Sequence, residues 1–452
     1  MVLGGHTSRW PRRLLPAALL AAAMWITWWS VVRGRVLQRK QVSVFLGAAP
    51  LVGRNPTDGW DWRFGWGLVG AIAVAALVCF GCWSGWFWRI RQRWVIAAAA
   101  VGASAFATLL ALTDGLDGLR YGAQHKTEYL ATLSTKPPAG EFVRTFLARL
   151  DNYSVHVRGH PPGFVLVLKF LHVVGLGGVW PVVLLSVISA GVVAAAVLVT
   201  VRAIAGDEWM RRCAPLLIVA PYAIWMVTSA DAFYTAVAAT GVAALAEGVT
   251  RPRRQSVWFG LAAGLLLGSL LFLTYLGALL VILPAVIVIA ALVQLKRGAA
   301  TSLLTAGIAA VAAGAVIAAF RVAGFWWLDG VTATKRQYAV GTAQFREWGY
   351  FKYGNIGAAM FAIGPLTVAG FGTLRNRRMW LLVGAAGAGL LVSHLSQYTK
   401  AEVERIWLLF YPWLVIAGAA MMTRSRRWLT PALVGAQAAC AVVLQAALVT
   451  KW

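Results

Sequence analysis

Long apolar segments recur along this chain, and short basic clusters separate many of them. A helix crosses a bilayer with about 20 apolar residues. A chain of 452 residues that is 60% hydrophobic has more such segments than a soluble core can use. The sequence therefore predicts an all-α, polytopic integral membrane protein, with residues 1–452 in a single transmembrane domain. We expect about 13 spans, at about 14–32, 66–88, 94–113, 180–203, 213–228, 231–249, 256–274, 277–295, 301–321, 355–374, 379–396, 405–422 and 428–450.

Basic clusters fall in alternate loops between these spans. By the positive-inside rule such loops are cytoplasmic, and so is the N-terminus, which we interpret as a retained first helix. The net charge of +26 then reflects membrane topology, and nucleic acid is not an expected partner. Arg33, Arg35, Arg39 and Lys40 break the alternation, because this layout places them outside. The clusters that obey it are Arg9/Arg12/Arg13, Arg89/Arg91/Arg93, Arg202/Arg211/Arg212, Arg251/Arg253/Arg254, Lys296/Arg297, Arg375/Arg377/Arg378 and Arg424/Arg426/Arg427.

Two loops on the opposite, extracytoplasmic side are long. The larger covers 114–179, and the second covers 322–354. Within the larger loop, the segment Gly163–Leu176 is apolar but short, and Lys169 and His172 interrupt it. We expect this segment to be an interfacial helix that lies on the outer membrane surface and not a span.

Acidic residues gather on the extracytoplasmic side of this layout. Of fifteen, only Asp207, Glu208 and Glu247 lie on the inner side, which leaves twelve outside. The segment Thr113–Gly163 alone contains five acids and three of the six histidines. This concentration of titratable groups predicts that the active face is extracytoplasmic. The eight residues are Asp114, Asp117, Glu128, Glu141, Asp151, His125, His156 and His160.

Asp114 and Asp117 lie at the outer end of the third predicted span. Aspartate and glycine are common turn residues, so these carboxylates can simply mark the end of a helix. A carboxylate at the membrane boundary can also have a raised pKa, which suits a general base. We prefer Asp117 for that role, because Arg120 and Tyr121 follow it.

Two further acid–base candidates stand beside predicted turns. His160 precedes two prolines, which form either a rigid turn before the interfacial helix or the support for a histidine that contacts an anionic group. Asp231, in the segment SADAFY, either caps the sixth span with its carboxylate or faces a substrate cavity.

The loop 322–354 interleaves cations with aromatic residues, among them Lys335, Arg346 and Tyr350. This pattern is typical of an aromatic belt with cations that reach toward the membrane interface. It also suits a pocket for a phosphate beside a sugar, since cations neutralise the phosphate.

Charged residues also precede the twelfth predicted span. Lys400, Glu402, Glu404 and Arg405 lie there, and Glu402 is a natural ion-pair partner for Arg405 or Lys400. A surface ion cluster is one interpretation. An unpaired cation at the start of an apolar helix is expensive, however, so a phosphate ligand is the other.

These features together resemble the GT-C superfamily of polytopic glycosyltransferases. TDGLDGLRYG is similar to the acidic segment of aminoarabinose transferases, and DNYSVHVRGHPPG is similar to a segment of protein O-mannosyltransferases. SADAFY is similar to an outer-turn aspartate segment of several members. The resemblance covers about 110–280 and has departures. The acidic loop follows the third predicted span and not the first, and Asp114-Gly-Leu-Asp117 replaces an adjacent acidic pair.

The resemblance implies transfer of a sugar, with mannose and arabinose as candidates, from a polyprenyl-phosphate donor to an extracytoplasmic glycan, lipid or protein. It implies an inverting single displacement in the cell membrane, and membrane lipids as the surroundings. No ligand spacing demands a metal or other cofactor, although a divalent ion between carboxylates is compatible. The alternative is a transporter or flippase of lipid-linked sugars or polymers. The implied roles are Asp117 and Asp114 as catalytic acids, donor phosphate contacts from Arg405, Arg346, Lys335 and His160, and substrate contacts from Tyr121, Asp231, Glu402, Glu404 and Tyr350.

Overall fold

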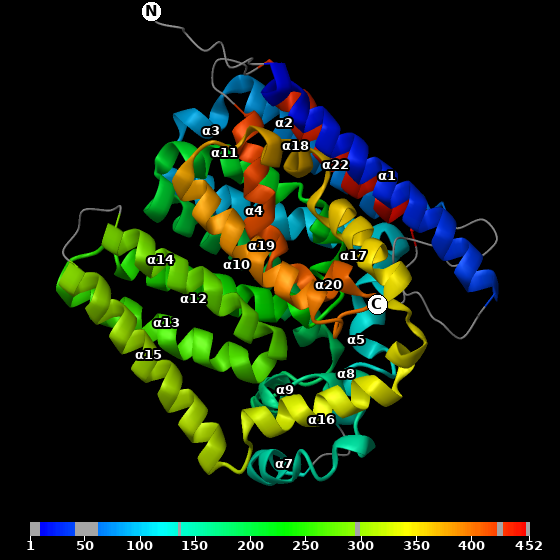
Figure 1. Cartoon of the computed structure of the whole chain (residues 1–452), viewed down its shortest axis with the longest axis vertical. Helices are drawn as coiled ribbons and strands as arrows, with labels where there is room; N and C mark the ends of the chain where they lie inside the picture. The colour runs from blue at the N-terminus through cyan, green and yellow to red at the C-terminus, as the bar shows by residue number, and fades with distance from the viewer. Residues whose placement is uncertain (1–9, 41–61, 134–136, 294–298, 423–427, 449–452) are drawn as a thin grey trace, which may run out of the picture.

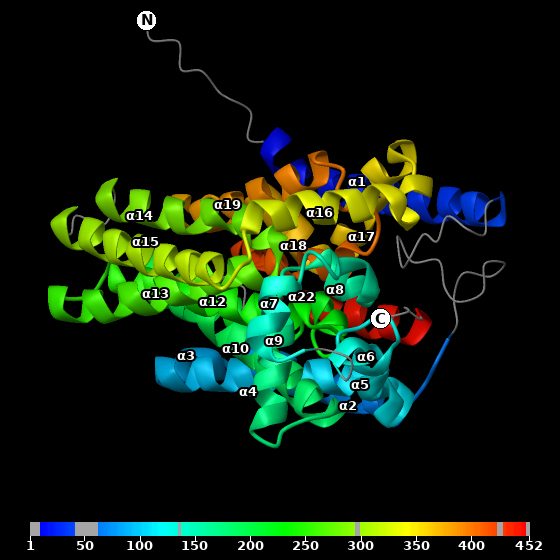
Figure 2. The same ribbon diagram turned by 90° about the horizontal axis from the view of Figure 1, so that it is seen from below.

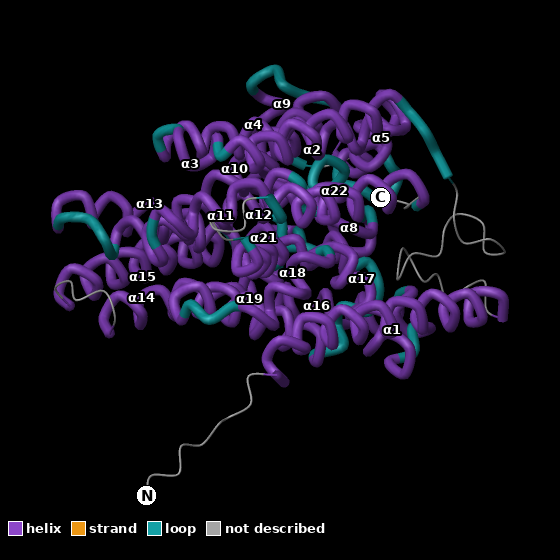
Figure 3. The backbone as a smooth tube through the Cα atoms, turned by 90° about the horizontal axis from the view of Figure 1, so that it is seen from above, coloured by secondary structure: helices purple, strands orange, loops and turns teal. Residues whose placement is uncertain are grey.

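The computed structural model describes residues 10–40, 62–133, 137–293, 299–422 and 428–448, and these residues form helices, turns and loops without strands (Figure 3). Eight helical segments among them are long and apolar enough to cross a membrane, or up to ten if each of two bent pairs counts as one span. An all-α, polytopic membrane protein is therefore confirmed, and the finer count of spans stays a prediction. One of the eight lies within α1 (Trp10–Lys40), and another begins with α4 (Gln92–Ala111) and continues to Gln124. The other six are α2 (Trp66–Ser84), α10 (Val179–Ala205), α13 (Arg253–Leu273), α15 (Ala299–Val322), α19 (Arg377–Leu395) and α22 (Thr430–Ala447).

Four of the expected spans are not single long helices, and the one expected at 355–374 is described below as a bent pair. The segment expected at 213–228 is covered by the end of α11 (Asp207–Ile218) and the 3-10 helix η4 (Pro221–Trp225). The segment expected at 277–295 begins in the 3-10 helix η5 (Tyr275–Val281) and continues as α14 (Ile282–Val293). The segment expected at 405–422 is divided among α20 (Val403–Ile406), η7 (Trp407–Leu409), α21 (Tyr411–Val415) and η8 (Ile416–Met421).

Three of the predicted basic turns meet at one end of the helix bundle, which we call the basic end. Arg9 and the clusters Lys296/Arg297 and Arg424/Arg426/Arg427 lie outside the described residues. Arg211 donates to the carbonyls of Phe87 and Ile90 at 2.6 and 2.9 Å, so the start of α11 lies against the end of α3 (Trp86–Arg89). Arg378 likewise donates to the Ile204 carbonyl at 3.4 Å. Because turns far apart in sequence share these contacts, their basic clusters lie on the same side of the molecule.

Short helices gather at the opposite end, which we call the loop end (Figures 1 and 2). Between α4 and α10 the chain forms η2 (Leu112–Asp114), α5 (Gly115–Gln124), α6 (Leu130–Leu133), α7 (Ala139–Thr145), η3 (Leu150–Asn152), α8 (Val155–Gly159) and α9 (Gly163–Val173). Helix α9 occupies the segment expected to be interfacial. Its Phe164 and Leu168 are buried, whereas Phe170 and Val173 are 65% and 81% exposed. This one-sided burial suits a helix at a membrane surface.

One bent pair consists of α17 (Trp348–Ile363) and α18 (Pro365–Thr373), which meet at 94°. Gly364 lies between them with φ +78, in the left-handed region that favours glycine. The side chain of Gln437, from α22, donates to the Ile363 carbonyl at 2.6 Å and accepts from the Leu366 amide at 3.0 Å. A break at membrane depth leaves backbone groups that only protein can satisfy, and Gln437 satisfies two of them.

Glycines on α13 allow a close approach to α15. Gly264 lies directly against the carbonyl of Ala309 and the side chain of Ala312, so an added side chain would collide with both. Gly260 and Gly268, one turn to either side, also contact α15. Small residues at this spacing drive helix association in membranes, where the hydrophobic effect between helices is absent. Two further helices, α12 (Asp231–Gly248), which precedes α13, and α16 (Trp327–Val340), which follows α15, contribute to the loop end.

Gly264→Ile is expected to separate α13 from α15 and to lower the thermal midpoint of the purified protein in detergent. Overpacking of this kind costs about 1–3 kcal/mol. Gly314→Ile is the matched control, because a side chain added at Gly314, on α15, meets open space. Equal midpoints for the two variants, measured by fluorescence-detected unfolding, would contradict the close packing of α13 on α15.

Gln437→Leu is expected to destabilise the bent span, because the Ile363 carbonyl and the Leu366 amide lose their partner at a fully buried position. Two unsatisfied buried groups cost about 2–4 kcal/mol. The same substitution at the exposed Gln255 of α13 is the control and is expected to leave the unfolding midpoint within error. A neutral Gln437→Leu would show that the break is satisfied in another way.

Candidate functional site

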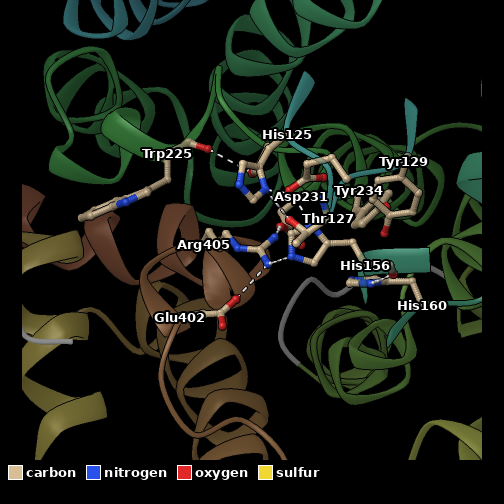
Figure 4. Close-up of polar contacts among 12 residues, drawn as sticks. His125, Thr127, Tyr129, His156, His160, Trp225, Asp231, Tyr234, Glu402 and Arg405 are labelled. Carbon is tan, nitrogen blue, oxygen red and sulfur yellow. Dashed lines mark hydrogen bonds and ion pairs between the residues drawn. The ribbon is translucent and has the colours of Figure 1, made fainter. Parts of the chain in front are cut away.

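A buried guanidinium group lies at the centre of the loop end. Arg405, on α20, is 4% exposed. It donates to Asp231 at 2.9 Å, to Glu402 at 3.0 Å and to Nε2 of His156 at 2.8 Å (Figure 4). These partners come from the start of α12, from the loop before α20 and from α8. A buried cation requires such neutralisation, because an unpaired charge in low dielectric is very costly.

His156 connects this cation to a second carboxylate. Arginine is always a donor, so Nε2 of His156 must accept, and the imidazole carries its proton on Nδ1. Nδ1 lies 2.5 Å from a carboxylate oxygen of Glu128, which is itself 4% exposed. Burial alone would raise the pKa of Glu128, but the contact from His156 and the nearby Arg405 cation lower the pKa of this carboxyl below its usual range. Glu128 is therefore held as a carboxylate. We refer to Glu128, His156, Arg405, Asp231 and Glu402 as the Arg405 cluster.

Aromatic side chains cover one flank of the Arg405 cluster. Tyr234, on α12, donates to the hydroxyl of Tyr129 at 2.8 Å, and the ring of His160 lies 5.9 Å from that of Tyr129 (Figure 4). Nδ1 of His160 also lies 2.9 Å from the His156 carbonyl. Burial lowers the pKa of His160, so its imidazole is neutral at pH 7. This flank thus presents neutral polar groups beside the charges.

The loop that supplies Glu402 has an unusual backbone. Gln397, Ala401 and Glu402 have positive φ values of 62°, 69° and 61°, which non-glycine residues rarely adopt. The buried side chain of Asn355, on α17, holds this loop by donating to the Thr399 carbonyl at 2.7 Å and accepting from the Ala401 amide at 3.1 Å. Strained residues persist only where the surroundings fix them, so α17 sets the direction of the Glu402 carboxylate.

Arg346 is a second buried cation at this loop. It donates to the Lys400 carbonyl at 2.7 Å and to Glu402 at 3.2 Å. Burial alone would raise the pKa of Glu402, but Arg405 and Arg346 lower it to about 2. Two guanidinium groups therefore converge on one carboxylate, which stays ionised across the physiological range.

A cavity opens between α5, α9, the start of α10 and the turn 227–230. Its enclosed part is small, with a volume of about 20 Å³, and the space widens toward open solvent. Glu128 lines this cavity, together with the polar residues Tyr129 and Ser229 and with apolar side chains such as Phe164 and Val183. The Arg405 cluster therefore reaches an accessible space through Glu128.

The structure brings five of the predicted site residues together: Asp231, Glu402, Arg405, Arg346 and, through His156, His160. Asp231 begins α12, where a carboxylate is favourable, and its bond goes to Arg405.

Other predicted residues have different surroundings. Asp114 pairs with Arg63 beside the end of α22, and Asp117 pairs with Arg120 while its side chain is 73% exposed. Tyr121 is 52% exposed. The remaining three lie in the later segments: Lys335 over the ring of Tyr398, Tyr350 with its hydroxyl on the Ser30 carbonyl, and Glu404 fully buried.

Sequence reasoning missed the roles of Glu128, His156, Tyr129 and Tyr234 in this site. Glu128 and His156 belong to the concentration of acids and histidines in Thr113–Gly163, which was the available signal. Their pairing joins residues 28 positions apart through an irregular segment, and no sequence spacing indicates it.

A scan of protein-family models and a search of curated proteins found no match to this chain. Within the described residues, no group of three or more His, Cys, Asp or Glu side chains is arranged to hold a metal ion. The interpretation of the site therefore depends on its own geometry.

Arg405→Gln is expected to destabilise the protein strongly, because Asp231 and Glu402 would lose the cation between them. Breaking a buried pair in this way costs about 3–5 kcal/mol. Arg120→Gln is the control, since Arg120 pairs with Asp117 at an exposed position. Thermal unfolding of the two purified variants measures the difference. If they unfold together, the Arg405 cluster does not support the fold.

Proposed function

We propose that this protein is a membrane glycosyltransferase that moves a sugar from a polyprenyl-phosphate donor to an extracytoplasmic acceptor by inverting displacement. The observation that carries the proposal is the Arg405 cluster, in which three carboxylates, one histidine and one guanidinium group meet a cavity at the loop end. Perturbed ionisable groups beside a cavity are the usual marks of an active site.

The orientation follows from the charges. Basic turns face the cytoplasm in membrane proteins, so the basic end is proposed to be inside and the Arg405 cluster outside. The segments α11–η4, α12 and η5–α14 add three candidate crossings to the ten counted from the long helices and bent pairs, which supports a layout of about 13. We place the protein in the cell membrane with its N-terminus in the cytoplasm.

The donor requires both a membrane and a cation site. Its lipid enters sideways from the bilayer, and the leaving group is an anionic phosphate that cations stabilise as charge develops. Arg346 and Arg405 already converge on one carboxylate, Glu402, and two guanidinium groups around one anion suit a phosphate equally well. Lys335 and His160 are the further candidates for this contact. The residues present do not require a metal for the transfer.

A transporter of lipid-linked sugars is the second candidate. The two bent pairs, α17–α18 at 94° and the segments 403–421 at 80°, favour it, because discontinuous helices near a binding site are typical of transporters. The transferase has the stronger support, since the Arg405 cluster lies at the loop end of the bundle and not midway along it.

The direct test supplies protein in nanodiscs with a panel of radiolabelled polyprenyl-phosphate sugars and candidate acceptors. One donor is expected to be consumed, with release of polyprenyl phosphate. Arg346→Gln is expected to raise the KM for that donor roughly 10- to 100-fold, as loss of a charge-assisted bond does. Arg336→Gln, an exposed position on α16, is the control. Movement of intact donor across a vesicle membrane, without cleavage, would establish the transporter.

A further inference from the structure

Glu128 occupies the point where the Arg405 cluster meets the cavity. We infer that this cavity is the acceptor site and that Glu128 takes the proton of the acceptor hydroxyl. This inference rests on the proposed glycosyl transfer and assigns the base of that reaction. It differs from the assignment that the sequence resemblance implies, which gives the base role to Asp117 with Asp114.

The lining of the cavity singles out Glu128. It is the one acidic residue among the described residues that form the cavity wall. The other polar residues there carry hydroxyl groups, as Tyr129, Thr228 and Ser229 do, and the rest of the wall is mostly apolar. A mostly apolar pocket with a few convergent polar groups is the usual form of a small-molecule site. A hydroxyl group that enters this space from its open side can donate a hydrogen bond to one carboxylate there, that of Glu128.

The neighbours of Glu128 orient its carboxylate and keep it ionised, and the same contacts lower its pKa. His156 contacts one carboxylate oxygen through Nδ1 and is itself fixed by Arg405 at Nε2. A base that is oriented by a second group, which a third group holds in turn, is the recurring arrangement in catalytic sites. His156 acts here as a positioning residue, because both of its nitrogens are occupied by protein partners.

The charges around the cavity favour a neutral ligand at Glu128. Within this region the carboxylates of Glu128, Asp231 and Glu402 face the two guanidinium groups of Arg405 and Arg346. With His156 neutral, three negative charges meet two positive ones. An anionic phosphate beside Glu128 would add repulsion, whereas a sugar hydroxyl would not. The donor phosphate therefore belongs on the arginine side and the acceptor on the Glu128 side.

Helix α5 directs its one acidic residue, Asp117, away from the cavity. Leu119 and Gly122 are buried, Gly122 lies against the Thr228 carbonyl, and Ala123 lines the cavity. Asp117 lies five residues before Gly122, about 140° around the helix, and its side chain is 73% exposed on Arg120. The carboxylate that the resemblance favours thus points away from the cavity that α5 helps to form.

The proposed step balances in atoms and charge. The acceptor oxygen forms a bond to the anomeric carbon while its proton passes to the Glu128 carboxylate. The bond from the anomeric carbon to the phosphate oxygen breaks, and polyprenyl phosphate leaves with that electron pair. Glu128 afterwards returns its proton to solvent through the open cavity.

The decisive experiment compares Glu128→Gln, Asp117→Asn and Glu141→Gln in nanodiscs with the donor that the wild type consumes. Glu128→Gln is expected to lose about 100-fold or more in kcat with little change in donor KM, as removal of a general base does. Asp117→Asn is expected to keep activity within a few-fold. Glu141→Gln is the matched control, because Glu141 is an exposed acid of the same loop that pairs with Arg149.

A second variant protects the test against misfolding of Glu128→Gln. Ser186→Leu, on α10, places bulk in the cavity wall without changing any charge. It is expected to raise acceptor KM at least tenfold while donor KM stays unchanged, and size-exclusion profiles check the fold of each protein. Two results would overturn the assignment of Glu128 without affecting the proposed transferase. One is wild-type transfer by both Ser186→Leu and Glu128→Gln. The other is an inactive Asp117→Asn beside an active Glu128→Gln. Absence of transfer by the wild type would instead reject the proposed function, and the base assignment with it.

Discussion

The loop end of this protein depends on the burial of one cation. Arg405 begins a bent, largely buried segment, and a guanidinium group there must find acceptors on several sides. It finds them on α8, on α12 and in the loop that contains Glu402. These three segments are distant in sequence, so the requirement to neutralise one charge fixes their mutual placement. The cavity and its polar lining follow from that placement.

The regular helices follow from local pattern, and the breaks do not. The spans expected at 180–203, 256–274 and 301–321 agree with α10, α13 and α15 to within a few residues, because an unbroken apolar run encodes a helix by itself. The segment expected at 355–374 is also apolar, yet its helix bends by 94° at Gly364. The groups exposed by that turn are satisfied by Gln437, more than 70 positions later. A window of neighbouring residues contains no trace of such a partner.

The residues of the candidate site can likewise be predicted from the sequence only in part. Asp231, Glu402 and Arg405 are recognisable in the sequence, because each is a charged residue beside an apolar segment, where charge is expensive. Their assembly into one cluster is not recognisable, since it requires long-range contacts. Asp117 attracts attention by the same local criterion, but helix geometry turns it toward solvent, whereas Glu128 reaches the cavity through an irregular segment without a helical or strand period.

The contacts at the two ends bear on the choice between transferase and transporter. Alternating access requires one part of a bundle to move against another, so that a site opens to each side in turn. At the basic end, Arg211 and Arg378 join turns from different parts of the chain through backbone carbonyls. At the loop end, the Arg405 cluster joins α8, α12 and α20 through buried charges, whose separation would leave them unpaired. A molecule joined in this way at both ends favours chemistry at one fixed face. The strained loop at Glu402 adds to this rigidity, because it fixes the direction of a carboxylate between two guanidinium groups.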